Sequence, residues 1–240
     1  MNILGVKVDN LTKKEILEKI RTFLAEPKFH QIATINPEIV LEAQKNEDYK
    51  DILNNCDLNV ADGIGIKLAF WRFRKNLKTR FAGADLMLEI LRIASEEKLP
   101  IFLATNKDGL STFQETRDAI LKIYPALAVK GADINCHAEL VSTSHEILKQ
   151  VQDDKMVIFC NFGAPHQEFF INSIKCDTIR LAMGVGGSFD FLTGKIRRAP
   201  KFMRLIGLEW LWRLWKQPKR FKRIFKAVFV FSYKVLLNKK

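Results

Sequence analysis

The chain has 240 residues, a mass of 27.7 kDa and a formal net charge of +12, with 48% hydrophobic and 28% charged residues. This composition excludes a disordered polypeptide, and the length accommodates one α/β domain with an appendage but not two independent enzymes. Because no apolar stretch reaches the roughly 20 residues of a transmembrane helix, we expect a globular protein that is not integral to a membrane. The lack of a Cys-x-x-Cys pair and of an apolar leader indicates a reducing cytoplasm.

Six short apolar runs alternate with segments of helical periodicity through the first two hundred residues. They are predicted as strands, at residues 31–35, 58–61, 100–104, 127–130, 155–160 and 178–184. A helix follows each run, and this alternation is typical of parallel strands joined by crossover helices. The predicted fold is therefore α/β, a Rossmann-like and mostly parallel sheet with flanking helices. Such sheets bind ligands beyond the carboxyl ends of their strands, so the functional residues are expected there.

Polar residues and glycines follow four of the predicted strands. Asn36 precedes Pro37 and fits a helix cap, with a binding role as the alternative. Asp62 follows an apolar strand and precedes Gly63, so its carboxylate can act as a general base or cap the next helix. Judged from its own segment alone, each of these two residues can be either a helix cap or a functional residue.

The glycine-rich segment 184–190 differs from a dinucleotide-binding loop at one position. The third glycine of G-x-G-x-x-G would fall at Phe189, which argues against a nicotinamide-dependent oxidoreductase. The glycines can still cradle a phosphate together with Ser188, and Asp190 can hold a ribose hydroxyl. The four histidines and the cysteines lack metal-ligand spacing and no Asp-x-Asp pair is present, so we expect no metal site.

The residues after 195 differ sharply in charge from the rest of the chain. Residues 196–240 hold 14 Lys and Arg and a single acid, Glu209, whereas residues 1–195 hold 25 bases and 26 acids. Nine of the 25 aromatic residues, including three of the four tryptophans, lie in this basic segment. We therefore predict an α/β domain at 1–195, which carries the candidate site, and a basic amphipathic helical appendage at 196–240.

The appendage has the pattern of amphipathic helices that lie on a membrane. A first set of apolar residues recurs at intervals of three and four and is predicted to share one helix face: Leu205, Leu208, Trp212 and Trp215. After Pro218, which should interrupt the helix, cations surround a second stripe: Phe221, Ile224, Phe225 and Val228. Two alternatives remain. The first stripe can dock on the protein's own core, and the cations can hold nucleic acid, although these aromatics lie on helical faces rather than on a strand platform.

Seven motifs, taken in order, resemble those of the WecG/TagA/CpsF family of bacterial glycosyltransferases. The resemblance runs from the strand before Thr34 to about Arg223. Its segments are TINPE at 34–38, DGIG at 62–65, RFAGAD at 80–85, GAPHQE at 163–168, GVGGSFD at 184–190, RRAP at 197–200 and GLEWL at 207–211. It implies an inverting, metal-independent hexosyltransferase that moves an N-acetylmannosamine-type sugar from UDP to polyprenyl-diphosphate-linked N-acetylglucosamine. The product would enter teichoic acid, capsule or related cell-surface polymers.

The resemblance also implies roles for individual residues. Asp62 matches the family's proposed base, and Thr34 lies with it in the catalytic pocket. The residues expected to bind the nucleotide are Asn36, Arg80, Gly163, Gln167, Gly186, Gly187, Ser188 and Asp190. Those that match positions near the substrate diphosphates are Arg213, Arg220 and Arg223. The implied partners are a UDP-sugar, a lipid-linked acceptor and the inner face of the cell membrane, without a metal cofactor or nucleic acid; self-association and the identity of the sugar are left open.

Overall fold

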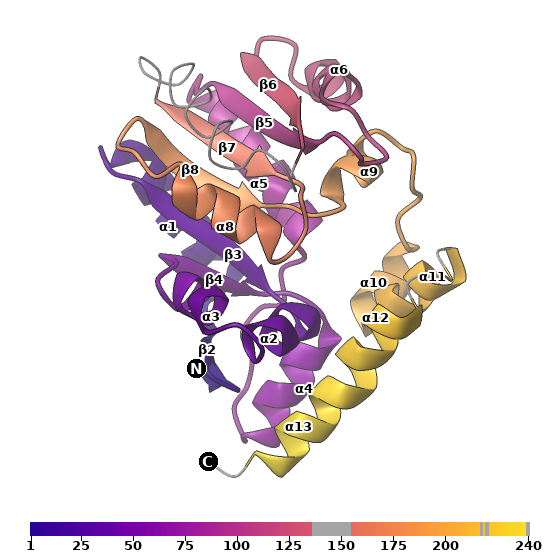
Figure 1. Cartoon of the computed structure of the whole chain (residues 1–240). Helices are drawn as coiled ribbons and strands as arrows, with labels where there is room; N and C mark the ends of the chain where they lie inside the picture. Colours follow the sequence, from indigo (N-terminus) through magenta and orange to yellow (C-terminus); the bar gives the residue numbers. More distant parts are fainter. Residues whose placement is uncertain (136–154, 217, 219–220, 239–240) are drawn as a thin grey trace.

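The computed structural model describes residues 1–135, 155–216, 218 and 221–238. These residues build a six-stranded sheet with the order β4-β3-β8-β7-β5-β6, in which every neighbouring pair is parallel (Figure 1). Its strands are β3 (His30–Ile35), β4 (Leu58–Ala61), β5 (Ile101–Asn106), β6 (Val129–Ile134), β7 (Met156–Cys160) and β8 (Ile179–Gly184). The predicted strands and the α/β class are confirmed. A short antiparallel pair that was not predicted, β1 (Asn2–Ile3) and β2 (Val6–Lys7), precedes them.

Helices cover both faces of the sheet, because its strands are apolar on both faces. One face packs against α1 (Lys13–Ala25), α5 (Gly83–Glu96), α6 (Phe113–Ile123) and α9 (Ser188–Leu192). The other packs against α2 (Pro37–Ala43), α3 (Glu47–Asn54), α4 (Ile64–Arg72) and α8 (His166–Ser173). The alternating side chains of β7 show how the sheet separates the two cores. Val157 and Phe159 enter the first core, whereas Ile158 and Cys160 enter the core beneath α8.

The helix beginnings follow from local sequence. Thr12 and Glu15 form a reciprocal capping box at the start of α1, and Thr112 and Glu115 form another at α6. Asn36 caps α2, since its Oδ1 accepts a hydrogen bond from the Ile39 N–H at 3.0 Å. The capping interpretation of Asn36 is therefore confirmed, and it does not exclude a second role at the cavity described below.

The appendage is a series of short helices. They are α10 (Lys201–Ile206), α11 (Glu209–Lys216), α12 (Phe221–Phe225), a π-helical turn η2 (Lys226–Val230) and α13 (Phe231–Leu237). The predicted shared face of Leu205, Leu208, Trp212 and Trp215 is wrong, because Gly207 adopts a left-handed conformation (φ +83°) and ends α10. Leu205 and Trp215 are 82% and 71% exposed, so these two side chains do not dock on the core.

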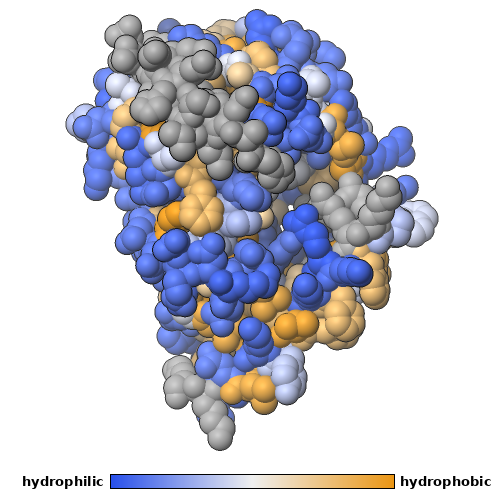
Figure 2. Space-filling view, viewed as in Figure 1, coloured by the Kyte–Doolittle hydropathy of each residue, from blue (hydrophilic) through white to orange (hydrophobic). Residues whose placement is uncertain are grey.

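The last helices divide the second predicted stripe between two sides. Phe221, Phe225 and Phe229 form an outward row, with successive ring centroids 6.0 and 4.8 Å apart. Ile224 and Val228 instead line a cavity. Figure 2 shows apolar surface gathered along the lower right of the view, where α12 and α13 lie in Figure 1. None of the helices in the described part of the chain is long and apolar enough to cross a bilayer.

The carboxyl-terminal helix is part of the core of the molecule. Phe231 and Val235 of α13 are buried in the same cluster as Val40 of α2 and Phe70 of α4. Figure 1 shows α13 running along α4 at one end of the molecule. The division into 1–195 and 196–240 remains a prediction based on charge, and the appendage closes over the α/β body rather than extending from it.

Candidate active site

Five strands end at one edge of the sheet and supply the residues of a polar cavity of about 390 Å³. Because the strands are parallel, their carboxyl ends bring together residues that are far apart in the sequence. The polar cavity is lined by Thr34, Asn36, Glu38, Ile39, Asp62, Ala82, Gly83, Ala84, Asn106, Asp108, Gly109, Leu110, Asn161, Phe162, Gly163, Ala164, Gln167, Gly184, Val185, Gly186, Gly187, Ser188, Asp190, Arg198, Glu209 and Arg223. It unites Asp62 and Thr34 with seven of the eight residues expected to bind a nucleotide.

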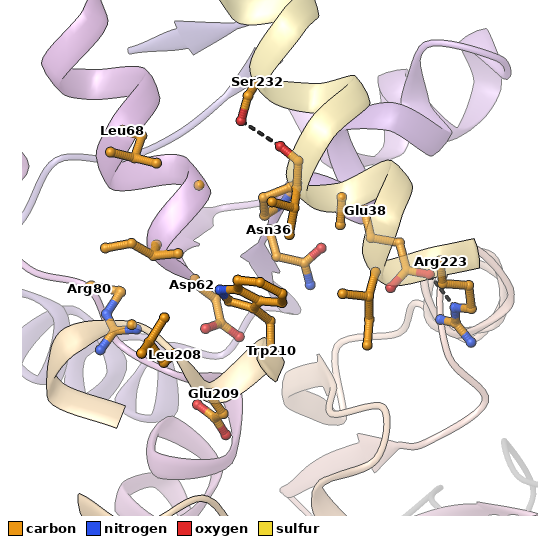
Figure 3. Close-up of a pocket in the computed structure, with 18 of the residues that line it drawn as sticks. Asn36, Glu38, Asp62, Leu68, Arg80, Leu208, Glu209, Trp210, Arg223 and Ser232 are labelled. Carbon is orange, nitrogen blue, oxygen red and sulfur yellow. Dashed lines mark hydrogen bonds and ion pairs between the residues drawn. The ribbon is translucent and has the colours of Figure 1, made fainter. Parts of the chain in front are cut away.

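A second cavity of about 410 Å³ lies on the other side of Asp62, between α4 and the appendage (Figure 3). Aliphatic side chains from α4, the appendage and the turn between α10 and α11 dominate its walls: Ile64, Leu68, Ile206, Leu208, Ile224 and Val228. We call it the apolar cavity. The two cavities share Asn36, Glu38, Asp62, Glu209 and Arg223. They therefore meet at a polar junction that contains the predicted base.

Asp62 is held at this junction by its place in the chain. It follows β4 directly, and its N–H donates to the Ile35 carbonyl at 2.8 Å, which keeps it beside the end of β3. Its Oδ2 accepts a hydrogen bond at 3.3 Å from the N–H of Gly83, the first residue of α5. The N-terminus of a helix attracts negative charge, so α5 orients the carboxylate. Figure 3 shows Asp62 directed into the apolar cavity together with Trp210.

Thr34 approaches the same helix start. Its side chain is so near to Gly83 that a Cβ on that glycine would lie 3.1 Å from the Thr34 Oγ1. Gly65 of the DGIG segment packs against Pro37, whose Cγ would lie 2.5 Å from an added Cβ. Close packing of α2 against α4 therefore requires glycine at position 65.

Gln167 joins the two loops that form the floor of the polar cavity. Its Oε1 accepts hydrogen bonds from the N–H groups of Gly163, after β7, and Gly186, after β8, at 3.2 and 3.1 Å. The side chain is 4% exposed. A Cβ at Gly184 would lie 2.4 Å from its Nε2, so position 184 must be glycine for the amide to reach between the loops.

We expect Gln167→Leu to raise the KM for a nucleotide-sugar donor about 10- to 100-fold with a smaller change in kcat. The substitution leaves two N–H groups without their acceptor, at a cost of about 1–3 kcal/mol each, and uncouples the loops. Steady-state kinetics with varied donor would measure it. Gln114→Leu on the exposed face of α6 is the control and should leave the donor KM unchanged. An unchanged donor KM in Gln167→Leu would contradict the assignment of Gln167 to donor binding.

Glu168, next to Gln167, is buried, and both of its side-chain hydrogen bonds come from neutral groups. Its Oε1 accepts from Gln167 Nε2 at 2.7 Å and its Oε2 from the Tyr49 hydroxyl of α3 at 3.1 Å. Burial raises the pKa of Glu168 to about 7, although both hydrogen bonds oppose this rise. Burial, and then the nearby Glu168 charge, raise the pKa of Tyr49 far above its usual range. The carboxylate fixes which way the Gln167 amide faces.

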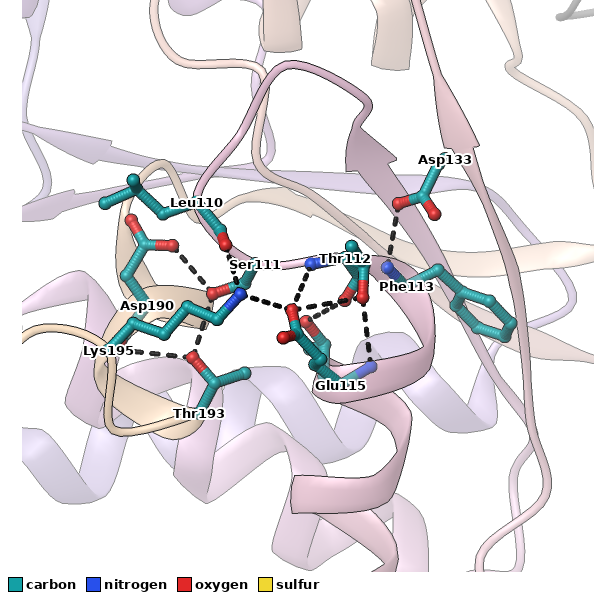
Figure 4. Close-up of polar contacts among 10 residues, drawn as sticks. Leu110, Ser111, Thr112, Phe113, Glu115, Asp133, Asp190, Thr193 and Lys195 are labelled. Atoms are coloured by element: carbon teal, nitrogen blue, oxygen red, sulfur yellow. Dashed lines mark hydrogen bonds and ion pairs between the residues drawn. The ribbon is translucent and has the colours of Figure 1, made fainter.

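Asp190 is positioned by the loop that follows β5 (Figure 4). Its Oδ1 accepts from the buried Ser111 hydroxyl at 2.8 Å, and Ser111 Oγ lies 2.8 Å from Thr193 Oγ1. Lys195 contacts Glu115 and the Leu110 carbonyl, and so anchors the same loop to the segment after α9. These contacts present Asp190 to the polar cavity.

The predicted arginines lie in different places. Arg80 lines the apolar cavity, not the polar one, and its Nη2 donates to the Arg204 carbonyl. Arg223 lines both cavities and pairs with Glu38. The backbone of Arg213 belongs to α11, but its side chain lies outside the described residues, as does the whole of Arg220. Only Arg223 of the three is thus placed near the junction by the structure.

An ion pair that the sequence did not single out fastens the appendage to the body. Arg198 donates two hydrogen bonds to Asp85, in the first turn of α5, at 2.6 and 2.9 Å. Burial alone would raise the pKa of Asp85, but the hydrogen bonds and charge of Arg198 lower it below its usual value. Arg198 also lines the polar cavity, beside Glu209 of α11 at 4.0 Å. The described residues contain no group of three or more His, Cys, Asp or Glu placed to hold a metal ion.

Comparison with known proteins agrees with this geometry. The family model described as "Glycosyl transferase WecG/TagA/CpsF family" matches residues 1–240. The chain belongs to this glycosyltransferase family. Several relatives are similar to the chain over most of their length. One from Staphylococcus aureus (strain MRSA252) is 32% identical, over 100% of this chain and 93% of the relative. One from Bacillus subtilis (strain 168) is also 32% identical, over 90% of this chain and 80% of the relative.

A third relative, from Bacillus spizizenii (strain ATCC 23059 / NRRL B-14472 / W23), is 31% identical over 85% of this chain and 77% of its own length. All three relatives are named N-acetylglucosaminyldiphosphoundecaprenol N-acetyl-beta-D-mannosaminyltransferase. Family membership makes this chain a glycosyltransferase, and the junction of the two cavities is its candidate active site.

Proposed function

We propose that the protein transfers an N-acetylmannosamine-type sugar from a UDP-sugar to N-acetylglucosamine linked to a polyprenyl diphosphate, with inversion at the anomeric carbon and without a metal ion. The names of its relatives support the sugar and the acceptor. The observation that carries the mechanism is that Asp62 lies where a polar and an apolar cavity meet. In this position the carboxylate can take a proton from an acceptor in one cavity while a donor occupies the other.

The polar cavity fits the nucleotide donor. Asp190 offers a fixed carboxylate for ribose hydroxyls, and Arg198 and Arg223 offer positive charge for a diphosphate. Among the loop amides, Gly186 donates to Gln167 and Ser188 to the Val185 carbonyl. Charge on a leaving UDP is therefore met mainly by arginine, and the proposal requires no metal for this role.

The apolar cavity fits the lipid-linked acceptor. Its aliphatic walls suit the first units of a polyprenyl chain, and Arg80 and Arg223, which also line it, offer positive charge for a diphosphate. An acceptor sugar between that diphosphate and the polar cavity would present a hydroxyl to Asp62. The donor and acceptor thus approach the same carboxylate from two sides.

The proposed step is a single displacement. The acceptor oxygen attacks the anomeric carbon while Asp62 takes its proton, the bond from that carbon to the β-phosphate oxygen breaks, and UDP leaves with the bonding electrons. Attack opposite to the leaving group inverts the configuration. The Gly83 N–H donates to Oδ2 of Asp62 and so orients the carboxylate that takes the proton.

A transfer assay would test this function. The full chain is incubated with a panel of UDP-sugars and a short-chain lipid-diphosphate-N-acetylglucosamine, with and without EDTA, and the products are resolved by mass and anomeric configuration. We expect transfer from UDP-N-acetylmannosamine, with inversion and unchanged by EDTA. Retention of configuration, or loss of activity in EDTA, would contradict the mechanism, and transfer from a different donor alone would contradict the proposed sugar.

We also propose that the appendage rests on the anionic inner face of the cell membrane, where a lipid-linked acceptor is found. Its exposed face carries Lys222 and Lys226 beside the outward row of phenylalanines. Deleting the appendage is a poor test, because loss of Phe231 and Val235 would uncover the core. Charge reversal on the full chain avoids this problem.

We expect Lys222→Glu/Lys226→Glu to weaken binding to vesicles containing anionic lipid by about thirtyfold or more, since each cation near such a surface contributes about 1 kcal/mol. Flotation with vesicles would measure it. Lys14→Glu/Lys19→Glu on the exposed face of α1 is the control, with the same change in net charge. Equal flotation of the two double variants would reject the role of the appendage.

A further inference from the structure

The α/β body has an exposed apolar crest of its own on α4. Trp71 is 78% exposed and Leu68 is 50% exposed, although both belong to a helix whose opposite face is buried. At helical spacing, Leu68 and Trp71 are three residues apart and lie on the same side, away from the buried Ile66, Ala69 and Phe70. Two large neighbouring apolar side chains on a catalytic body need an explanation beyond ordinary scatter on a surface.

The segment around this crest is the most one-sided charge run in the body. Between Asp62 and Asp85 the chain has six bases and no acid: Lys67, Arg72, Arg74, Lys75, Lys78 and Arg80. All of these except Arg80 are exposed. Lys67 and Arg72 precede and follow the crest on α4, so cations flank the two apolar side chains. Counting charge over the whole body, which is close to neutral, conceals this local excess.

The crest also adjoins both the appendage and the apolar cavity. Arg72 donates to the Leu236 carbonyl of α13 at 3.2 Å, and a Cβ on Gly65 would lie 3.5 Å from the Phe231 ring, so α4 and α13 run side by side in the same direction. Leu236 is 59% exposed. Leu68 lines the apolar cavity, and Trp71 lies one turn further along the helix. Figure 3 shows Leu68 on α4 at the edge of that cavity.

We propose that α4 is a second membrane-contacting element, in which Trp71 and Leu68 enter the headgroup region of an anionic bilayer while the surrounding lysines and arginines contact its phosphates. Tryptophan favours the boundary between lipid and water, and a helix with an apolar crest flanked by cations matches an interfacial helix. The complementary charge identifies an anionic lipid surface as the occupant, rather than a second copy of this basic protein.

This contact deepens the proposed function and rests on it, because it would set the entrance of the apolar cavity against the bilayer. A polyprenyl chain could then move from lipid to Leu68 without crossing water. The membrane surface would be built from two segments distant in sequence, α4 of the body and α12 to α13 of the appendage. Binding to the membrane would also fix the orientation of the junction at Asp62 relative to the acceptor.

The test uses the full chain and vesicles of phosphatidylcholine with phosphatidylglycerol that contain neither acceptor nor sugar nucleotide. We expect Trp71→Ala to weaken vesicle binding about tenfold, since one large apolar side chain is then no longer buried in lipid. Arg74→Glu/Lys75→Glu should weaken it at least about thirtyfold, with the loss reduced in high salt. Ile123→Ala, a matched apolar substitution on the exposed end of α6, should bind as the parent does.

The outcomes separate this inference from its rivals. Trp71→Ala should keep its transferase activity on a water-soluble acceptor, because Trp71 lines neither cavity. Unchanged vesicle binding by both Trp71→Ala and Arg74→Glu/Lys75→Glu would overturn the proposal. Weaker vesicle binding would also overturn it if sedimentation velocity showed that the same substitution dissociates an oligomer, because the crest would then be a contact between copies of the chain. Failure of the transferase assay would bear on the proposed function and leave the vesicle result standing.

Discussion

Asp62→Asn is expected to reduce kcat by about 10²- to 10⁴-fold, the range typical for loss of a positioned general base. The amide cannot take the acceptor's proton, but its oxygen can still accept the Gly83 N–H, so the connection between β4 and α5 is preserved. The KM for the donor should change little, because Asp62 lies at the junction and not among the groups that hold the nucleotide. Full activity in the variant would reject the mechanism.

Two measurements would separate lost chemistry from a damaged fold in the Asp62 variant. We expect UDP to raise the thermal unfolding temperature of the variant as much as that of the parent, since a ligand stabilises the state that it binds. Asp118→Asn, an identical substitution on the exposed face of α6, should retain the parent's kcat within about threefold. A variant that loses both activity and UDP binding would show that Asp62 supports the site structurally.

The second large effect concerns the buried Glu168. We expect Glu168→Gln to remove a loss of stability that the parent suffers as pH rises from about 4.5 to 7. The pKa of Glu168 is raised from 4.5 to about 7 by burial, so in this window the folded state holds a proton that the unfolded state has released. Stability then falls as pH rises, up to about 3 kcal/mol for one group with such a shift.

The sign follows from the two protonation states of Glu168. Below pH 4.5 the carboxyl is neutral in both folded and unfolded chains and does not affect stability; above pH 7 the folded chain must keep a buried charge. The amide introduced by Glu168→Gln would stay neutral throughout, while its oxygen accepts from Gln167 and its amino group donates to the Tyr49 oxygen. Urea unfolding at pH 5 and pH 8 should show the variant gaining on the parent by about 2 kcal/mol between the two, since part of the loss has already occurred at pH 5.

Two titratable neighbours of Glu168, Tyr49 and Cys56, stay neutral in that range. Burial raises the pKa of Tyr49 and also that of Cys56, so neither ionises between pH 5 and 8. Glu18→Gln on the exposed face of α1 is the control and should leave the difference between the two pH values unchanged. If Glu168→Gln follows the parent at both pH values, the buried carboxyl does not titrate in this window.

Most of the sheet could be predicted because its strands are buried on both faces and read as nearly continuous apolar runs. The β1–β2 pair could not, since each strand has two residues and its turn places Leu4 at a positive φ of 49°, where no Asn-Gly signal marks it. The appendage was misjudged at Gly207. The spacing of the apolar residues from Leu205 to Trp215 assumes one continuous helix, whereas Gly207 ends α10 within that segment.

Half of the candidate site could be found from the rule that ligands bind at strand ends. Asn161 follows β7, and its Oδ1 accepts a hydrogen bond from the Asn106 N–H at 2.6 Å. Both residues lie at strand ends, but the sequence analysis missed them because no glycine or motif marked them. Arg198 and Glu209 could not be found this way, because the appendage brings them to the cavity by tertiary packing. Trp71 gave no signal either, since a sequence does not show which apolar residues of a body helix remain exposed.

The shared wall between the two cavities has a consequence for inhibition. Asn36, Glu38, Asp62, Glu209 and Arg223 border both spaces, so a small molecule bound against them would contact both cavities. A compound that joins a uridine-like head to a short hydrocarbon arm would span the boundary. Its two halves would reinforce one another through the high effective concentration that a short linker provides.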